Sequence, residues 1–254
     1  MNVAIWLSYD GTRYDGWQKQ GNTNKTIQGK LESILERFSG RKVEVHGSGR
    51  TDAGVHALGQ VGNFHLEERV EAAEVMEYLN RYLPEDIMVW KAKEVSPRFH
   101  SRLNAVRKTY RYQIEMGSKK DVFQRHYYYG LGCKLNVERM KAASSFLIGT
   151  HDFRSFCSNR RIKKSTVRTV ERIVFTQADD SRISDSRLSI SFTGNGFLQQ
   201  MVRILTGTLI EVGLGKKQPD EIAEILEAMD RQRAGFTAPP EGLFLEHVEY
   251  GDLI

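Results

Sequence analysis

The segment Gly47-Ser48-Gly49-Arg50-Thr51-Asp52-Ala53-Gly54-Val55-His56 lies between two apolar, strand-like segments at residues 43–46 and 61–65. Its three glycines within eight residues indicate a backbone that needs positive φ or the close approach of another group. It lacks the Gly-Lys-Ser/Thr ending of a P-loop, and Asp52 stands where a dinucleotide fingerprint needs glycine. Two interpretations remain: an ordinary Asp-containing turn, or a glycine-supported loop that presents Arg50 and Asp52.

The N-terminal half is predicted to alternate strands and helices around this segment. Residues 3–9 are expected to form a strand that ends at the turn residues Asp10-Gly11. Thr26 is expected to cap a helix, because apolar residues follow it at helical spacing: Ile27, Leu31, Ile34, Leu35 and Phe38. A second helix is expected over residues 72–83 and a strand over 87–95. The first hundred residues therefore predict the order β-α-β-β-α-β.

The second half repeats this rhythm. A strand is expected at 109–114, followed by a helix that Asn136 caps and that directs Val137, Met140, Ala143 and Leu147 inward. Strands are then expected near 170–175 and 188–193, and helices at about 197–212 and 220–229. The last expected element is a strand at 244–248. No linker composition separates the halves, which favours two α+β halves that share one continuous sheet. We expect the first half to span residues 1–105 and the second 106–254, with a functional cleft between them.

Composition excludes several classes of protein. Of the 254 residues, 40% are hydrophobic, which is enough for a core. No apolar run approaches the ~18 residues needed to cross a bilayer, and the N-terminus lacks the features of a secretory signal. The two cysteines, Cys133 and Cys157, form no CxxC pair. We therefore expect a cytoplasmic protein rather than a membrane protein or a secreted disulfide scaffold.

Positive charge is clustered rather than large, since 37 Lys and Arg against 32 Asp and Glu give a net charge of +5. One basic stretch alternates with Phe99, Tyr110 and Tyr112, and it contains Arg98, His100, Arg102, Arg107, Lys108 and Arg111. A second contains Arg160, Arg161, Lys163, Lys164 and Arg168. Cations bind phosphate and aromatic rings stack on unpaired bases, but solvated charged faces produce the same pattern.

Further candidates each have two interpretations. Arg203 is the only charged residue between Phe192 and Ile210, so it either extends to solvent or pairs with a buried carboxylate. If that carboxylate is Asp52, the pair keeps it ionised. Tyr110 and Tyr112 share one strand face, where they either pack in the core or stack on an extruded base. The seven histidines show no metal-ligand spacing, and no serine-hydrolase motif occurs, so neither a metal nor that chemistry is expected.

Gly49-Arg50-Thr51-Asp52-Ala53-Gly54-Val55-His56-Ala57 resembles the signature of the tRNA pseudouridine synthase A family. The resemblance runs the length of the chain, through Tyr9-Asp10-Gly11-Thr12, Gly16-Trp17-Gln18-Lys19-Gln20, Thr26-Ile27-Gln28, Gly59-Gln60-Val61, Phe99-His100-Ser101-Arg102, Tyr110-Arg111-Tyr112, Met201-Val202-Arg203 with Gly207, and Ala238-Pro239-Pro240-Glu241-Gly242-Leu243. Ser101 departs from the family, which more often has alanine there. Several independent motifs in the family's order make the resemblance specific.

The resemblance implies an isomerase that converts uridine to pseudouridine at positions 38, 39 and 40 of the tRNA anticodon stem-loop. The reaction is Asp-dependent cleavage of the glycosidic bond, rotation of the base and rejoining of C5 to C1′. The implied fold has two pseudosymmetric ferredoxin/RRM-like halves, which share a continuous mixed, largely antiparallel sheet flanked by helices, with a basic active-site cleft between them. The resemblance also implies a cytoplasmic homodimer that binds the tRNA anticodon arm and uses neither metal nor organic cofactor.

Matched by motif, Asp52 corresponds to the family's catalytic aspartate and Arg203 to the arginine that pairs with it. Tyr110 corresponds to the active-site tyrosine, and Arg50 to a residue implicated in base extrusion. Additional RNA contacts are expected at Arg102, Arg160, Arg161, Lys163 and Lys164. The carboxylate acts either as a nucleophile at C1′ or as a base at C2′, and the sequence leaves both routes open.

Two alternatives to this enzyme are a non-catalytic RNA-binding or tRNA-folding protein on the same scaffold and a synthase of this fold that acts on another RNA. The presence of both Asp52 and Arg203 favours an enzyme over the first of these.

Overall fold

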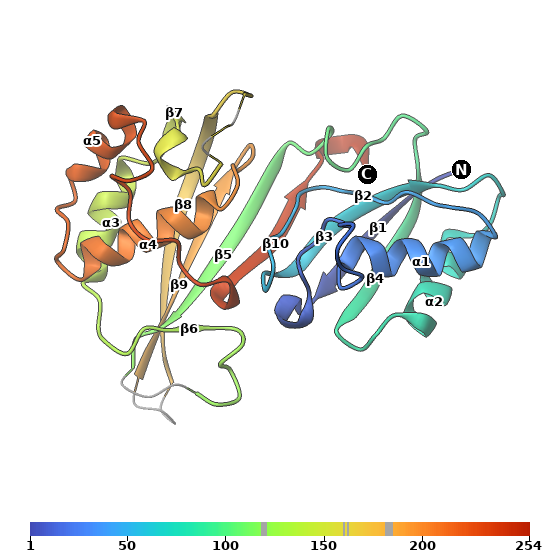
Figure 1. The fold of residues 1–254 in the computed structure, drawn as a ribbon, viewed down its shortest axis with the longest axis horizontal. Coiled ribbons are helices and arrows are strands. Elements are labelled where there is room, and N and C mark those ends of the chain that lie inside the picture. The colour runs from blue at the N-terminus through green and yellow to red at the C-terminus, as the bar shows by residue number, and fades with distance from the viewer. Residues whose placement is uncertain (118–120, 160, 162, 181–184) are drawn as a thin grey trace. The chain divides into compact units, whose positions relative to one another are not determined.

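The computed structural model describes residues 1–117, 121–159, 161, 163–180 and 185–254 of a mixed α+β protein (Figure 1). The chain forms two compact units. Unit 1 comprises Met1–Lys108 together with Phe244–Ile254, and unit 2 comprises Thr109–Leu243. Each unit combines a sheet with helices, as predicted, and five α-helices occur among the described residues.

The sheet of unit 1 has the strand order β4-β1-β3-β10, and the short β2 pairs with β3. Its strands are β1 (Asn2–Tyr9), β2 (His46–Gly47), β3 (His56–His65), β4 (Ile87–Val95) and β10 (Leu243–Glu249). All pairings are antiparallel except that of β10 with β3, which is parallel. The sheet is therefore mixed, and β3, which follows the Asp52 loop, lies inside it rather than at an edge.

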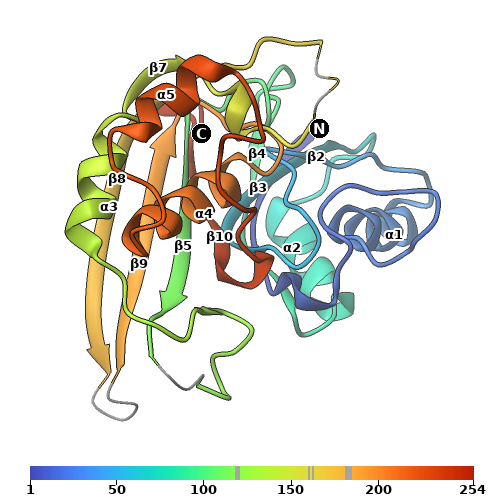
Figure 2. The ribbon, with the colours of Figure 1, turned by 60° about the vertical axis from the view of Figure 1, so that its left-hand side comes forward.

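Helices α1 (Ile27–Ser39) and α2 (Ala72–Tyr82) belong to unit 1 (Figures 1 and 2), with the short 3₁₀ helices η1 (Gly11–Arg13) and η4 (Gly251–Leu253). Thr26 caps α1 as predicted, because its hydroxyl accepts a hydrogen bond from the Gly29 N–H at 3.2 Å. Side chains of the α1 stripe and alternate residues of β1 are fully buried: Ile5, Leu7, Leu31 and Leu35. Burial of this stripe fixes the register of β1.

Unit 2 has the strand order β5-β9-β8-β7, with β6 parallel to β5. Its strands are β5 (Arg107–Glu115), β6 (Tyr129–Gly130), β7 (Gly149–Asp152), β8 (Val167–Asp180) and β9 (Asp185–Gly194). Its helices are α3 (Val137–Ser145), η2 (Arg154–Phe156), α4 (Met201–Gly213), α5 (Glu221–Ala228) and η3 (Pro240–Gly242). Figure 1 shows α3, α4 and α5 grouped beside β8, and α4 is mostly buried between its neighbours.

The predicted β-α-β-β-α-β order is confirmed, and β4 has the predicted bounds. Residues 43–45 are not a strand, since only His46–Gly47 pairs with β3. The helix predicted from residue 197 begins at Met201, because Gln200 has a φ of 59° and cannot be part of it. The C-terminal strand β10 belongs to unit 1, where Phe244 pairs with His56 of β3.

Within the part of the chain that the structure describes, no helix has the length and apolar character needed to cross a membrane.

Candidate active site

The loop between β2 and β3, residues 48–55, carries Asp52 and is tied down by backbone hydrogen bonds at both ends. Ser48 N–H donates to Val61 O at 2.7 Å, and Gly54 N–H donates to Tyr14 O at 3.2 Å. At the centre of the loop, Trp17 N–H donates to the Thr51 carbonyl at 3.0 Å. The segment that follows β1 therefore holds the backbone directly before Asp52.

Four buried polar side chains reinforce this loop, and we call Tyr9, Ser48, Thr51 and Gln60 the Tyr9–Gln60 network. The Tyr9 and Thr51 hydroxyls are hydrogen-bonded at 2.8 Å. Gln60 Nε2 donates to Tyr9 Oη at 3.3 Å and to Gly49 O at 2.9 Å, and Ser48 Oγ donates to Gln60 Oε1 at 2.6 Å. Each partner is less than a tenth exposed, so leaving one unsatisfied costs roughly 1–3 kcal/mol.

Burial raises the pKa of Tyr9 to about 12, an effect that its hydrogen bonds to Thr51 and Gln60 only partly oppose. The phenol is therefore protonated at neutral pH and able to donate to Thr51. Tyr9 thus acts as a neutral anchor of the loop rather than as a proton-transfer group.

His56 closes the C-terminal end of the loop. Its ring is buried and stacks on Phe244 with centroids 4.7 Å apart, and Gly11 N–H donates to its Nδ1 at 3.1 Å. The Asp10 carboxylate also lies 3.1 Å from this nitrogen. A Cβ at Gly11 would overlap the Val55 carbonyl oxygen, so only glycine permits this approach of the 10–13 turn to the loop.

Asp52 is half-buried and Arg50 is exposed on this anchored loop. Thr51 and Val55 on either side of Asp52 are buried. The loop is thus a fixed backbone that presents one carboxylate without sealing it in the core, which is what a nucleophile or general base requires. Asp52 also begins a turn, because Val55 N–H donates to the Asp52 carbonyl at 3.1 Å and Gly54 has a φ of 76°. The segment is therefore an Asp-containing turn within an anchored loop, and a catalytic role for Asp52 stays a prediction.

Arg203 projects from the first turn of α4 and is half-buried. Its Nε donates to the Ala238 carbonyl at 2.7 Å, and Ala238 N–H donates to the Arg203 carbonyl at 3.1 Å. The guanidinium is therefore oriented by the backbone of residue 238, in the segment that leads to η3. Its pairing with Asp52 stays a prediction.

Tyr110 and Tyr112 of β5 are both buried but have different neighbours. The Tyr112 hydroxyl donates to Pro239 O at 2.8 Å, and burial, with a smaller contribution from Glu241, raises its pKa well above the ordinary value. Tyr110 packs edge-on against Phe197, with centroids 5.2 Å apart and planes at 81°. Tyr112 is thus a core residue that supports the 238–243 segment, and the predicted stacking of Tyr110 on a base stays a prediction.

The predicted site residues are divided between the two units. Unit 1 holds Arg50, Asp52 and Arg102, and unit 2 holds Tyr110, Arg161, Lys163, Lys164 and Arg203. Arg160 lies outside the described residues. Arg102, Arg161, Lys163 and Lys164 are exposed, as RNA contacts need to be.

Sequence reasoning missed Tyr9 and Gln60 as members of the site. Tyr9 is the last residue of an apolar strand, and its position gives no sign that its hydroxyl reaches Thr51. Gln60 did carry a signal, because it lies in the Gly59-Gln60-Val61 motif of the family, and the structure shows it as a fully buried amide of β3. A buried amide needs partners, and these partners are loop atoms.

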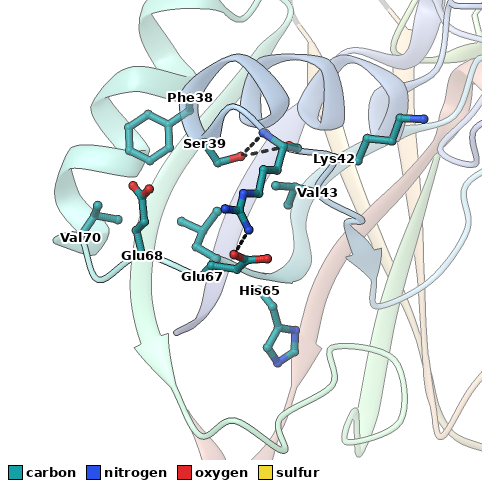
Figure 3. A pocket seen from close by; sticks show the side chains of 10 residues that line it. Phe38, Ser39, Lys42, Val43, His65, Glu67, Glu68 and Val70 are labelled. Carbon is teal, nitrogen blue, oxygen red and sulfur yellow. Dashed lines mark hydrogen bonds and ion pairs between the residues drawn. The ribbon is translucent and has the colours of Figure 1, made fainter.

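A pocket in unit 1 contains none of the predicted site residues. It lies between the end of α1 and the segment after β3, where Figure 3 shows Phe38, Lys42, His65 and Glu68 around it. Its charges are of both signs, and Arg41 pairs with Glu67 there. It therefore lacks the positive potential that an RNA site needs. Among the described residues, no group of three or more His, Cys, Asp or Glu side chains is placed to hold a metal ion.

Comparison with known proteins identifies the class of enzyme. The sequence model of the tRNA pseudouridine synthase family matches residues 5–104 and 142–251, and the chain belongs to this family. It is therefore an isomerase that converts uridine in tRNA to pseudouridine.

Curated relatives agree with this assignment over nearly their whole length. The tRNA pseudouridine synthase A of Bacillus sp. (strain KSM-64) is 48% identical over 249 residues, which cover 98% of this chain and 99% of the relative. The tRNA pseudouridine synthase A 2 of Bacillus anthracis is 44% identical over 250 residues, with the same coverage. A crystal structure of an unknown protein from Galdieria sulphuraria aligns over 76% of this chain and 80% of its own at 10% identity, and its TM-score of 0.23 is too low to inform the fold.

Proposed function

We propose that the chain isomerises uridines 38, 39 and 40 of the tRNA anticodon stem-loop, with Asp52 as the catalytic carboxylate. The observation that carries this proposal is the anchored loop of the family signature. Thr51 and Val55 are buried and hydrogen-bonded, while Asp52 itself stays partly accessible. Such preorganisation is what a group needs if it is to meet a reacting sugar in one geometry.

The reaction conserves atoms. The C1′–N1 bond of the uridine breaks, the uracil turns, a C1′–C5 bond forms, and the hydrogen leaves C5 while N1 gains a proton. Asp52 either attacks C1′ as a nucleophile or removes the C2′ proton as a base, and both roles need an ionised carboxylate. Because no electron or energy carrier enters this balance, the proposed reaction needs neither a redox centre nor an energy source. The resemblance to the family implies that it uses neither a metal nor an organic cofactor.

Three other side chains complete the proposed site. Arg203 pairs with Asp52 through its guanidinium, whose fork geometry suits a carboxylate. Tyr110 receives the ring of the target base, and Arg50 fills the space that the base leaves in the stem. Extrusion of a base costs a few kcal/mol, and these two contacts offset part of it.

The proposed site needs a basic cleft between two pseudosymmetric halves, 1–105 and 106–254, that share a continuous sheet, because Asp52 comes from the first and Arg203 from the second. The proposed partner is the tRNA anticodon arm, held also by Arg102, Arg160, Arg161, Lys163 and Lys164. We place the enzyme in the cytoplasm as a homodimer, in which the second half completes the dimer.

Product mapping tests the proposed positions. Unmodified tRNA transcripts with single uridines at 38, 39 or 40 are incubated with the protein, and pseudouridine is located by carbodiimide-dependent stops of reverse transcription. Stops at these positions, absent with Asp52→Asn, are expected. Stops only elsewhere in the tRNA would overturn the assignment of the anticodon stem-loop.

A further inference from the structure

One face of the unit 1 sheet is turned away from α1. The face that is directed toward α1 is the one that carries Ile5 and Val45, because a Cβ at Gly62 would contact both of these side chains. The Val45 N–H in turn donates to Glu32 of α1 at 3.2 Å. Ile5 therefore faces α1, and its neighbour Trp6 on β1 faces the other way, because successive side chains of a strand alternate.

This second face carries two tryptophans and two lysines. Trp6 pairs with Lys91 of β4, and the Lys91 ammonium lies 4.4 Å from the centroid of the Trp6 ring. A register shift after Trp6 brings Trp90 alongside, with the two indole centroids 6.5 Å apart. Ala4 pairs with Lys93. We call Trp6, Trp90, Lys91 and Lys93 the Trp6–Trp90 platform.

The Trp90 side of the platform is accessible in the described structure, whereas Trp6 is half-buried with the Lys91 ammonium over its ring. Trp90 is 45% exposed and its strand neighbour Met88 is 55% exposed, whereas the third tryptophan of the chain, Trp17, is 2% exposed. β4 is the outermost strand in the order of the unit 1 sheet, so the face ends at an edge that a ligand can reach. Large exposed aromatic side chains of this kind mark binding surfaces.

The chemistry of the platform favours RNA over an apolar protein surface. A protein that covered the two indoles would also bury the ammonium groups of Lys91 and Lys93, which is costly without acidic partners. RNA supplies a π-face for each indole and a phosphate for each lysine, and this is the composition of single-strand binding sites. Strand alternation directs Glu94, between Lys93 and Val95, to the opposite face.

We propose that the Trp6–Trp90 platform binds unpaired nucleotides of the tRNA substrate, with bases stacked on the indoles and phosphates on Lys91 and Lys93. None of its residues belongs to the proposed catalytic site, so it is an accessory site that raises affinity for tRNA. The inference depends on the family's substrate but not on the role of Asp52.

Tryptophan fluorescence tests the platform directly. Full-length tRNA and a single-stranded oligouridylate are each titrated into the protein, with a blunt RNA duplex as the control. Quenching by tRNA and by the oligouridylate but not by the duplex is expected. A Trp6→Phe/Trp90→Phe variant, in which only buried Trp17 emits, should lose most of this quenching. Equal quenching in that variant would overturn the proposal.

Binding measurements give the second test. Trp90→Ala is expected to weaken tRNA binding about tenfold, Trp90→Phe to retain most of the affinity, and Lys91→Gln to lower the salt slope by about one. Lys141→Gln, at an exposed lysine that pairs with Glu138 in unit 2, is the matched control. The rate of isomerisation of an anticodon stem-loop at saturating concentration should be unchanged in all four variants. This result distinguishes the platform proposal from the proposal that Asp52 is catalytic.

Either of two results would overturn the proposal. One is unchanged tRNA affinity in a folded Trp90→Ala protein. The other is a dimer, seen by sedimentation, that dissociates in Trp90→Ala, because this would assign the platform to contact between copies of the chain.

Discussion

In unit 1, the Asp52 loop is fixed by hydrogen bonds among buried polar side chains, whereas in unit 2 Arg203 stands on an apolar helix and is oriented by a backbone carbonyl. The loop depends on the hydroxyls of Tyr9 and Thr51 and the amide of Gln60. Arg203 depends on the Ala238 carbonyl. The loop that carries the carboxylate is therefore held by side chains, which substitution can remove singly, in addition to its backbone hydrogen bonds. The guanidinium is oriented by a backbone carbonyl, which substitution reaches only indirectly.

The largest effects on stability are expected at two glycines, Gly11 and Gly207, where the backbone of another segment packs too closely for a Cβ. A Cβ at Gly11 would overlap Val55 O beside the Asp52 loop, and a Cβ at Gly207 would overlap Phe236 O, two residues before Ala238. Gly11→Ala and Gly207→Ala are each expected to lower the free energy of unfolding by about 2–3 kcal/mol, measured by urea denaturation. Gly21→Ala, where a Cβ meets nothing within 4 Å, is the control and should change it by less than about 0.5 kcal/mol. A Gly11→Ala protein as stable as the control would contradict the close packing of the loop.

Replacing Arg203 tests the unit 2 side of the comparison. Arg203→Met is expected to lower the rate of pseudouridine formation about 100-fold, because the proposed partner of Asp52 is lost. Arg203→Lys should also be impaired, since an ammonium cannot replace the fork geometry of the guanidinium. Single-turnover kinetics measure the rate, with Arg233→Met, at an exposed arginine paired with Glu224, as the control. A rate within threefold of the wild type would exclude the pair.

Tyr9→Phe tests whether the network positions Asp52 or only stabilises the fold. Loss of the hydroxyl removes a partner from both Thr51 and Gln60, so the free energy of unfolding is expected to fall by about 1–2 kcal/mol. If the network positions the carboxylate, kcat should fall about tenfold while KM for tRNA is unchanged. Tyr82→Phe, at an exposed ring of α2, is the control. If Tyr9→Phe destabilises the protein but leaves kcat unchanged, the Tyr9–Gln60 network stabilises the fold and does not position Asp52.

The raised pKa of Tyr9 predicts an effect that is confined to alkaline pH. Because the pKa is about 12 in the folded protein and about 10 when unfolded, the folded state binds the proton more tightly. The corresponding stability is present below pH 10 and is lost as pH rises toward 12, at up to about 1.4 kcal/mol per pH unit. Denaturation of wild type and Tyr9→Phe at pH 9 and 11.5 measures this. The stability advantage of the wild type should shrink between the two values, and an undiminished advantage would contradict the shift.

The sequence predicted those parts of the fold that depend on local patterns. Thr26 and Asn136 cap their helices as expected, and the strand over residues 3–9 and the bounds of β4 are confirmed. The start of α4 was predicted wrongly, because Phe197 precedes Met201 at helical spacing whereas Gln200 adopts a left-handed backbone. Periodicity reports burial and does not detect such a reversal.

The candidate site was predictable only where a motif named its residues. Asp52 and Arg50 lie on a built loop, but the anchors Tyr9 and Gln60 were not predicted as site residues, because a hydrogen bond between residues 9 and 51 is a tertiary feature. The same holds for the Trp6–Trp90 platform, since its two indoles come together through the pairing and register shift of β1 and β4. Contacts between residues so far apart in the sequence cannot be predicted from local sequence patterns.

Release of tritium from tRNA labelled at C5 of uridine tests the central claim most directly, because C5 loses its hydrogen only when it bonds to C1′. We compare wild type with Asp52→Asn and measure tRNA affinity in parallel. Release by the wild type, a loss of about 1,000-fold or more in the variant and nearly equal affinity are the predicted results. Release by Asp52→Asn at the wild-type rate, or none from a wild type that binds tRNA tightly, would contradict the account.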